Sequence, residues 1–160
     1  MSLQTDIIFA KAIKSDEGIL SLLKAGDVYN TTIAMPDEDL ANAPVPYVIV
    51  SFDGLTNDQS TKDDYEGDTD TVTVSIEIAA ETRPKLAALA KMIRKAVRRY
   101  FIACLKEGND MVPLDYQFSA KPVNYDSLKP CFWQELTYQC DVRNDTSDEE
   151  NEGENGTQEN

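Results

Sequence analysis

The sequence contains no histidine among its 160 residues. Histidine is the most common general base, proton shuttle and metal ligand, so its absence excludes Ser–His and Cys–His nucleophilic systems. A structural zinc site is also difficult to build, because three scattered cysteines do not supply its four ligands. We therefore assign no catalytic, cofactor-binding or metal-binding residue, expect no cofactor, and expect that the chain is not an enzyme.

Cysteines and long apolar runs are scarce as well. Cys104, Cys131 and Cys140 form no CxxC pair, and the longest apolar run near the N-terminus is residues 7–10. A run this short predicts neither a signal peptide nor a membrane span. Three cysteines in such a chain indicate free, buried thiols. We expect a cytoplasmic chain that has no disulfide and no membrane partner.

Nucleotide-binding and hydrolase motifs are missing, since the sequence has no G-x-G-x-x-G, no P-loop and no G-x-S-x-G. The net charge of −14 argues against binding nucleic acid through the overall electrostatic field. We therefore expect no specific nucleic-acid partner.

Charge divides the chain into two parts. Residues 141–160 contain eight acidic residues, one basic residue and a single apolar residue, Val142. Such a segment cannot bury a core, so it is predicted as a disordered acidic C-terminal tail. Residues 1–140, with 21 acidic and 14 basic residues, are predicted to form a single domain.

Two runs carry the strongest strand signal. Residues 47–52 follow Pro46 and are expected to end at Asp53-Gly54, and residues 71–78 alternate strictly between apolar and polar. The alternation directs four side chains towards the core: Val72, Val74, Ile76 and Ile78. The two runs are expected to pair antiparallel. Further strands are predicted at 28–34, 116–122 and 131–142.

The longest predicted helix begins after Thr82, the expected N-cap, with Pro84 tolerated in the first turn. Apolar residues from Leu86 to Cys104 form one stripe along this helix, and basic residues occupy the opposite arc. That arc comprises Lys91, Arg94, Lys95, Arg98 and Arg99. Residues 4–14 and 16–24 are predicted as two short helices, the second closed by Gly26 in a left-handed cap.

Strands separated by one long helix, without βαβ alternation, favour an α+β fold. We predict an antiparallel β-sheet with one long amphipathic helix packed on one face and a short N-terminal helical pair.

The acidic segment 56–70 suggests calcium binding, but the EF-hand register that puts Gly67 at the sixth position places Lys62 first and Thr73 twelfth. A solvated loop that stays out of the core, or an extended arm, is the simpler interpretation.

The basic helix face likewise has an ordinary interpretation as a solvent face. However, an acidic protein with one basic face is complementary in charge to other copies of itself. This complementarity allows head-to-tail packing into a ring or filament.

We therefore name four basic residues of the helix face as candidate oligomer-interface residues. They are Lys91, Arg94, Lys95 and Arg98.

The layout resembles the tail terminator and tail completion (minor tail) proteins of long-tailed phages. Four features carry the resemblance in order: a helical pair ending LLKAG before Val28-Tyr29, the strand 46–50 after a Pro-rich loop, the alternating strand 71–80, and the helix 86–102. They span residues 2 to roughly 105, and none is a catalytic signature.

The resemblance implies a non-enzymatic structural subunit of a phage or prophage tail. In this family a homo-oligomeric ring, commonly a hexamer, ends the growth of the tail tube and joins it to the head connector. The resemblance further implies that the acidic loop 56–70 contacts the lumen or a neighbouring subunit, and that the basic helix face meets an acidic patch of a neighbour. The candidate oligomer-interface residues of that loop are Asp63, Asp64, Glu66 and Asp68. The implied partners are further copies of the chain, the tail tube protein and the head-tail connector protein, and the chain would pass from the cytoplasm into the assembled virion. Two alternatives stay open: a nucleic-acid-binding accessory protein that uses the basic helix face, and a metal-dependent enzyme that uses the acidic loop.

Overall fold

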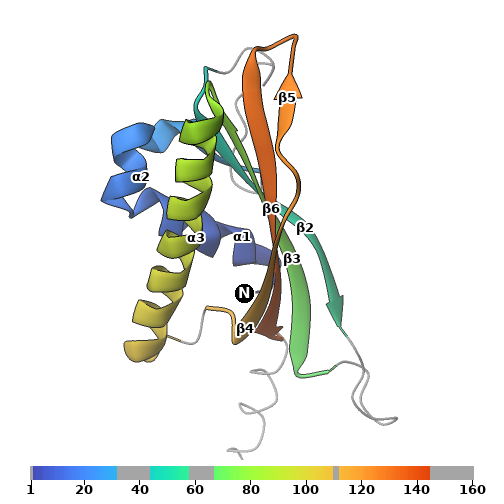
Figure 1. Ribbon diagram of the computed structural model, residues 1–160. Helices are drawn as coiled ribbons and strands as arrows, with labels where there is room; N and C mark the ends of the chain where they lie inside the picture. The colour runs from blue at the N-terminus through green and yellow to red at the C-terminus, as the bar shows by residue number, and fades with distance from the viewer. Residues whose placement is uncertain (1, 32–43, 58–66, 110–111, 145–160) are drawn as a thin grey trace, which may run out of the picture.

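The computed structural model describes residues 2–31, 44–57, 67–109 and 112–144 (Figure 1). Its helices are α1 (Thr5–Lys14), α2 (Glu17–Leu22) and α3 (Arg83–Lys106), with short 3-10 helices at Ser2–Gln4 and Ala25–Asp27. Its strands are β1 (Val28–Asn30), β2 (Tyr47–Asn57), β3 (Thr69–Ala80), β4 (Asp115–Ala120), β5 (Asn124–Asp126) and β6 (Cys131–Arg143).

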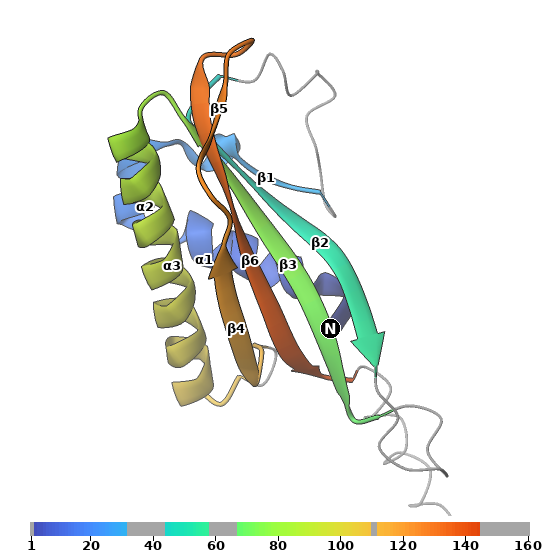
Figure 2. The same ribbon diagram turned by 45° about the vertical axis from the view of Figure 1, so that its right-hand side comes forward.

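The strands form one sheet in the order β1-β2-β3-β6-β4, and β5 also pairs with β6. Every pairing is antiparallel except that of β1 with β2. The helices lie against one face of this sheet, with α3 running along its length (Figures 1 and 2). The predicted α+β fold is thus confirmed, with a mixed, mostly antiparallel sheet.

The two strongest strand predictions are confirmed in both pairing and facing. β2 pairs antiparallel with β3, with Val48 opposite Ile78 and Val50 opposite Ile76. The four predicted inward residues of β3 are completely buried. Asp53-Gly54, however, does not end the strand, so that prediction is wrong. A register shift between Phe52 and Gly54 absorbs an extra residue, and β2 continues to Asn57.

The core lies between the helices and the sheet. Phe9 of α1 is completely buried, and its ring centroid lies 5.1 Å from that of Phe101 on α3 and 4.9 Å from that of Tyr138 on β6. Thr82 caps α3 as predicted, because its hydroxyl accepts a hydrogen bond from the backbone N–H of Lys85. This packing fixes the orientation of α3 relative to the sheet.

The N-terminal region departs from prediction after α2. The helix ends at Leu22, because Leu23 is extended and buried. Gly26 therefore does not form a left-handed cap and lies within the second 3-10 helix. The carboxylate of Asp27 accepts a hydrogen bond from the backbone N–H of Lys24 and holds that turn.

At the C-terminal end, β6 runs to Arg143 and so continues past the predicted domain boundary at residue 140. The backbone N–H of Asn144 donates to the carbonyl of Asp68, which ties the end of β6 to the start of β3. Of the predicted disordered tail at 141–160, the residues from 145 onward lie outside the described residues, and so do residues 58–66 of the predicted loop or arm. β5 was not predicted from the sequence.

The sheet face opposite the helices carries a smaller apolar cluster of Tyr47, Ile49, Ala79 and Cys131. Beside it Glu77 lies directly opposite Glu135 on the neighbouring strand. Burial raises the pKa of Glu77, the charge of Glu135 raises it further, and a hydrogen bond from Tyr47 opposes the increase. This face therefore brings two like charges together.

All three cysteines are free and buried, as the sequence predicted. No helix within the described part of the chain is long and apolar enough to cross a membrane.

Candidate functional site

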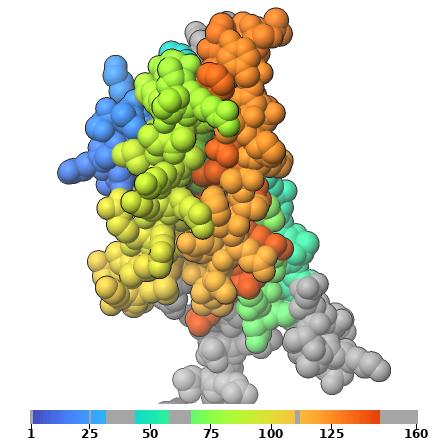
Figure 3. Space-filling view, viewed as in Figure 1, coloured from blue at the N-terminus to red at the C-terminus, as the bar shows by residue number. Residues whose placement is uncertain are grey.

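A surface groove separates the middle of α3 from strand β4. Lys91, Arg94, Lys95 and Arg98 line one wall of the groove. The rest of the lining comes from Ala90 of α3, from Tyr116, Phe118 and Ala120 of β4, and from Gln134 and Leu136 of β6. The groove has a volume of about 580 Å³. Figure 3 shows α3 and the segment that contains β4 side by side on one face of the molecule. The structure therefore brings the four predicted basic residues together in one groove, which we call the basic groove.

The position of β4 at the edge of the sheet explains which of its side chains form the groove floor. The backbone N–H of Lys121 donates to the carbonyl of Glu135, so in this antiparallel register Ser119 and Gln117 also direct their backbone groups towards β6. The intervening residues, Tyr116 and Phe118, place their side chains on the α3 side and their backbone groups towards the open edge. The groove thus lies beside a strand edge that no described strand covers.

Aromatic packing holds the groove floor in place. The guanidinium carbon of Arg94 lies 4.1 Å from the centroid of the Phe118 ring, a cation–π contact. The Phe118 ring packs in turn against Tyr138, with centroids 5.1 Å apart, and Tyr116 packs against both Tyr138 and Phe101. The floor is therefore an extension of the hydrophobic core.

The four cations of the basic groove have no ion-pair partner among the described residues. The ion pairs found there join Lys85 to Glu81, Arg99 to Asp16 and Lys121 to Glu135. In a chain with a net charge of −14, the groove is thus a concentrated positive region whose charges are not neutralised within the described structure.

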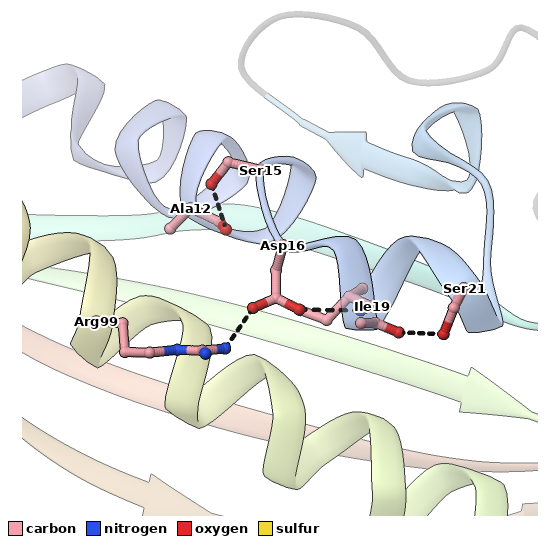
Figure 4. A network of polar contacts seen from close by, with 7 residues as sticks. Ala12, Ser15, Asp16, Ile19, Ser21 and Arg99 are labelled. Carbon is pink, nitrogen blue, oxygen red and sulfur yellow. Dashed lines mark hydrogen bonds and ion pairs between the residues drawn. The ribbon is translucent and has the colours of Figure 1, made fainter.

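Arg99 does not belong to this region, although the sequence placed it on the same arc. One residue adds 100° around a helix, so Arg99 faces α2 and pairs with Asp16 (Figure 4). Asp16 also caps α2 by accepting a hydrogen bond from the backbone N–H of Ile19. The predicted arc therefore divides into four groove residues and one residue that joins two helices.

The four basic residues of α3 that line the groove continue towards its C-terminal end as exposed apolar residues, and we call the whole row the exposed stripe of α3. Ile102 is 42% exposed and Leu105 is 52% exposed. They follow Arg98 by four and seven residues, so they continue the same face of the helix. Leu114, just before β4, is 54% exposed. None of these exposed apolar residues was predicted from the sequence, although the helical spacing of Ile102 and Leu105 from Arg98 was available as a signal.

A second exposed apolar position lies at the tip of the β5–β6 hairpin. Leu128 is 96% exposed, and the carboxylate of Asp126 holds the turn by accepting a hydrogen bond from the backbone N–H of Leu128. The hairpin projects at the end of the molecule opposite the C-terminal end of α3 (Figure 1).

Of the acidic group of predicted interface residues, the structure describes only Asp68, which does not line the basic groove. Asp68 is exposed just before β3, and β6 separates β3 from β4 in the sheet. Asp63, Asp64 and Glu66 lie outside the described residues. Within the described ranges, no cluster of three or more acidic or cysteine side chains is arranged to hold a metal ion.

No protein-family model matches this chain, and no curated protein matches it. Its fold is similar to a chain in a solved structure described as the virion of a native gene transfer agent particle, with a TM-score of 0.50 and 18% sequence identity. The match covers 87% of this chain and 94% of that chain. At this identity the likeness shows a shared fold.

Proposed function

We propose that this chain is a non-enzymatic structural subunit of a phage-like particle. Its fold matches a chain of a virion over most of both lengths. More narrowly, the layout of its elements supports a tail terminator or completion protein, which forms a homo-oligomeric ring at the end of the tail tube and joins the tube to the head connector.

The exposed stripe of α3 is the observation that carries this proposal. It passes from four cations, beginning at Lys91, to the exposed apolar residues Ile102 and Leu105. Protein interfaces combine an apolar centre with a polar rim. A surface built for nucleic acid would instead continue its positive charge along the helix. The stripe therefore favours a protein partner.

The placement of the exposed surfaces is suited to a ring. A ring needs a heterologous contact, in which one patch of a subunit meets a different patch of its neighbour. The apolar end of the α3 stripe and the hairpin tip at Leu128 are two such different patches, and they lie towards opposite ends of the molecule. In the proposed assembly the partners are further copies of the chain, six in the complete ring, together with the tail tube protein and the connector protein.

One observation favours a second candidate function. Arg94 and the aromatic floor at Phe118 together provide charge and a stacking surface, as single-stranded nucleic acid requires. A nucleic-acid-binding accessory protein would use the basic groove and would be retained on DNA with an affinity that falls steeply as salt increases.

Charge reversal in the basic groove tests the assembly proposal. We expect Arg94→Glu/Arg98→Glu to raise the apparent dissociation constant of self-association by about tenfold or more, equivalent to about 1.4 kcal/mol. Mass by light scattering across concentration and salt measures this change. Negative-stain images of the heaviest species show whether closed rings of fixed subunit number form.

A matched control is Lys24→Glu/Arg83→Glu, which makes the same change in net charge at exposed positions outside the groove. It should assemble as the parent chain does. Equal association by the groove variant, with unchanged circular dichroism, would remove the groove from the interface. A chain that stays monomeric under every condition would contradict self-assembly, and salt-sensitive retention on DNA would favour the alternative.

A further inference from the structure

The chain itself carries a segment that is complementary in charge to the basic groove. Residues 145–160 contain seven acidic residues and no basic residue. The groove presents four cations that pair with no carboxylate of the described residues. Opposite charges in these numbers favour association, and the attraction weakens with salt.

The end of β6, which precedes the segment in the chain, lies close to the groove. Asp141 of β6 lies opposite Asp115 of β4, and its carbonyl accepts a hydrogen bond from the backbone N–H of Leu114 at 2.8 Å. Tyr116, the first floor residue, follows Asp115 directly. Arg143, where β6 ends, is only two residues beyond Asp141. The chain therefore leaves the sheet beside the start of β4, which is also where the groove floor begins.

The length of the segment is sufficient to fill the groove. The 16 residues after Asn144 reach up to about 50 Å when extended. The floor from Tyr116 to Ala120 spans about 13 Å along β4, and the wall from Lys91 to Arg98 spans about 10 Å along α3. Several residues thus remain to turn the chain back before its acidic side chains meet the cations.

We infer that residues 145–160 dock in the basic groove of their own chain. Docking within one chain is favoured over docking on a second copy, because a short tether gives a millimolar effective concentration. The individual contacts are between exposed charges and are weak, so a partner that also covers Ile102 and Leu105 displaces the segment. The acidic segment would then screen the assembly surface of a free subunit, a consequence that rests on the proposed function.

Nuclear magnetic resonance of the full chain tests the contact. We expect Asp148→Asn/Glu149→Gln/Glu150→Gln/Glu152→Gln to shift backbone amide signals at positions 91–98 and 116–120. The difference from the parent spectrum should be independent of protein concentration. It should disappear at about 1 M salt, where the Debye length falls to about 3 Å.

The matched control keeps the charge of the segment and changes four of its neutral residues: Thr146→Asn/Asn151→Gln/Asn155→Gln/Gln158→Asn. It should leave the groove signals unchanged. Shifts confined to the segment itself, or found on another surface, would overturn the inference. A shift that grows with concentration would also overturn it, because the segment would then bind a second copy.

Light scattering on the same samples separates this inference from the proposed function. We expect the neutralised segment to lower, by severalfold, the concentration at which oligomers form. Groove shifts without oligomers in any variant would support the contact and contradict the assembly function. Oligomers in every variant without groove shifts would support assembly and refute the docked segment.

Discussion

Tyr138 offers a test of the packing beneath the basic groove. Its side chain is completely buried, and its hydroxyl has no hydrogen-bond partner among the described residues. Folding therefore removes this hydroxyl from water without replacing its hydrogen bonds, which costs about 1–3 kcal/mol. Tyr138→Phe keeps the ring contacts with Phe9 and Phe118 and removes the hydroxyl. We expect the free energy of unfolding in urea to rise by about 1–2 kcal/mol, and the melting temperature to rise by about 2–4 °C per kcal/mol.

The same substitution should change the dependence of stability on alkaline pH. Burial raises the pKa of Tyr138 above its ordinary value of 10.0. Above that pH the unfolded chain releases the proton while the folded chain retains it, so the stability present below pH 10 is lost as the pH rises towards the folded pKa. This contribution has a slope of about 1.4 kcal/mol per pH unit. Tyr138→Phe lacks it, so its advantage over the parent should grow above pH 10.

Other groups do not obscure this comparison. Burial also raises the pKa of Cys140 to about 12 and that of Tyr47 to about 12, but both residues are present in parent and variant and their effects cancel. Tyr125, which is 57% exposed, provides a control. Tyr125→Phe should change stability by less than about 0.5 kcal/mol. A loss of more than about 1 kcal/mol in Tyr138→Phe would refute the reasoning, because it would show that the hydroxyl forms a hydrogen bond in the folded state.

Three further substitutions test individual contacts. Asp16→Ala removes both the cap of α2 at Ile19 and the ion pair with Arg99, so it should lower the free energy of unfolding in urea by about 1–2 kcal/mol. Arg99→Ala removes only the ion pair and should lower it by less than about 1 kcal/mol. A larger loss in Arg99→Ala than in Asp16→Ala would contradict this account. Glu77→Gln removes a carboxylate whose pKa is raised by burial and by Glu135. The parent chain loses stability as pH rises from the ordinary pKa of 4.5 through the raised pKa of Glu77. The free energy of unfolding of Glu77→Gln, relative to that of the parent, should therefore increase as pH rises towards neutral. A difference between variant and parent that does not change with pH in urea unfolding would disprove this prediction.

The secondary structure was predictable where a local period repeated over many residues. Strict alternation in β3 identified its buried face, and the helical stripe from Leu86 identified the buried face of α3. The boundaries were less predictable. Gly54 looked like the end of a strand, but pairing with β3 carries β2 through a bulge to Asn57, because tertiary hydrogen bonds outweigh a local turn signal.

The candidate site was predictable only in part. Helical spacing identified the basic residues from Lys91 to Arg98, but it also included Arg99, which pairs with Asp16. It could not find the opposite wall of the groove, since Tyr116 lies on a strand whose neighbours depend on the sheet order. The expected role of the acidic loop is untested, because most of its predicted residues lie outside the described ranges.

The sequence by itself determined which classes of chemistry are absent and where charge is concentrated, because both depend on composition. It also determined which faces of α3 and β3 are buried, because these depend on short periods along the chain. Only the tertiary structure decided that β4 forms the edge beside α3, since residues distant in sequence meet there through the pairing of β4 with β6. That pairing converts a basic helix face into a groove with an aromatic floor. It also places Asp141, close to the end of β6, beside the start of β4, where that groove begins.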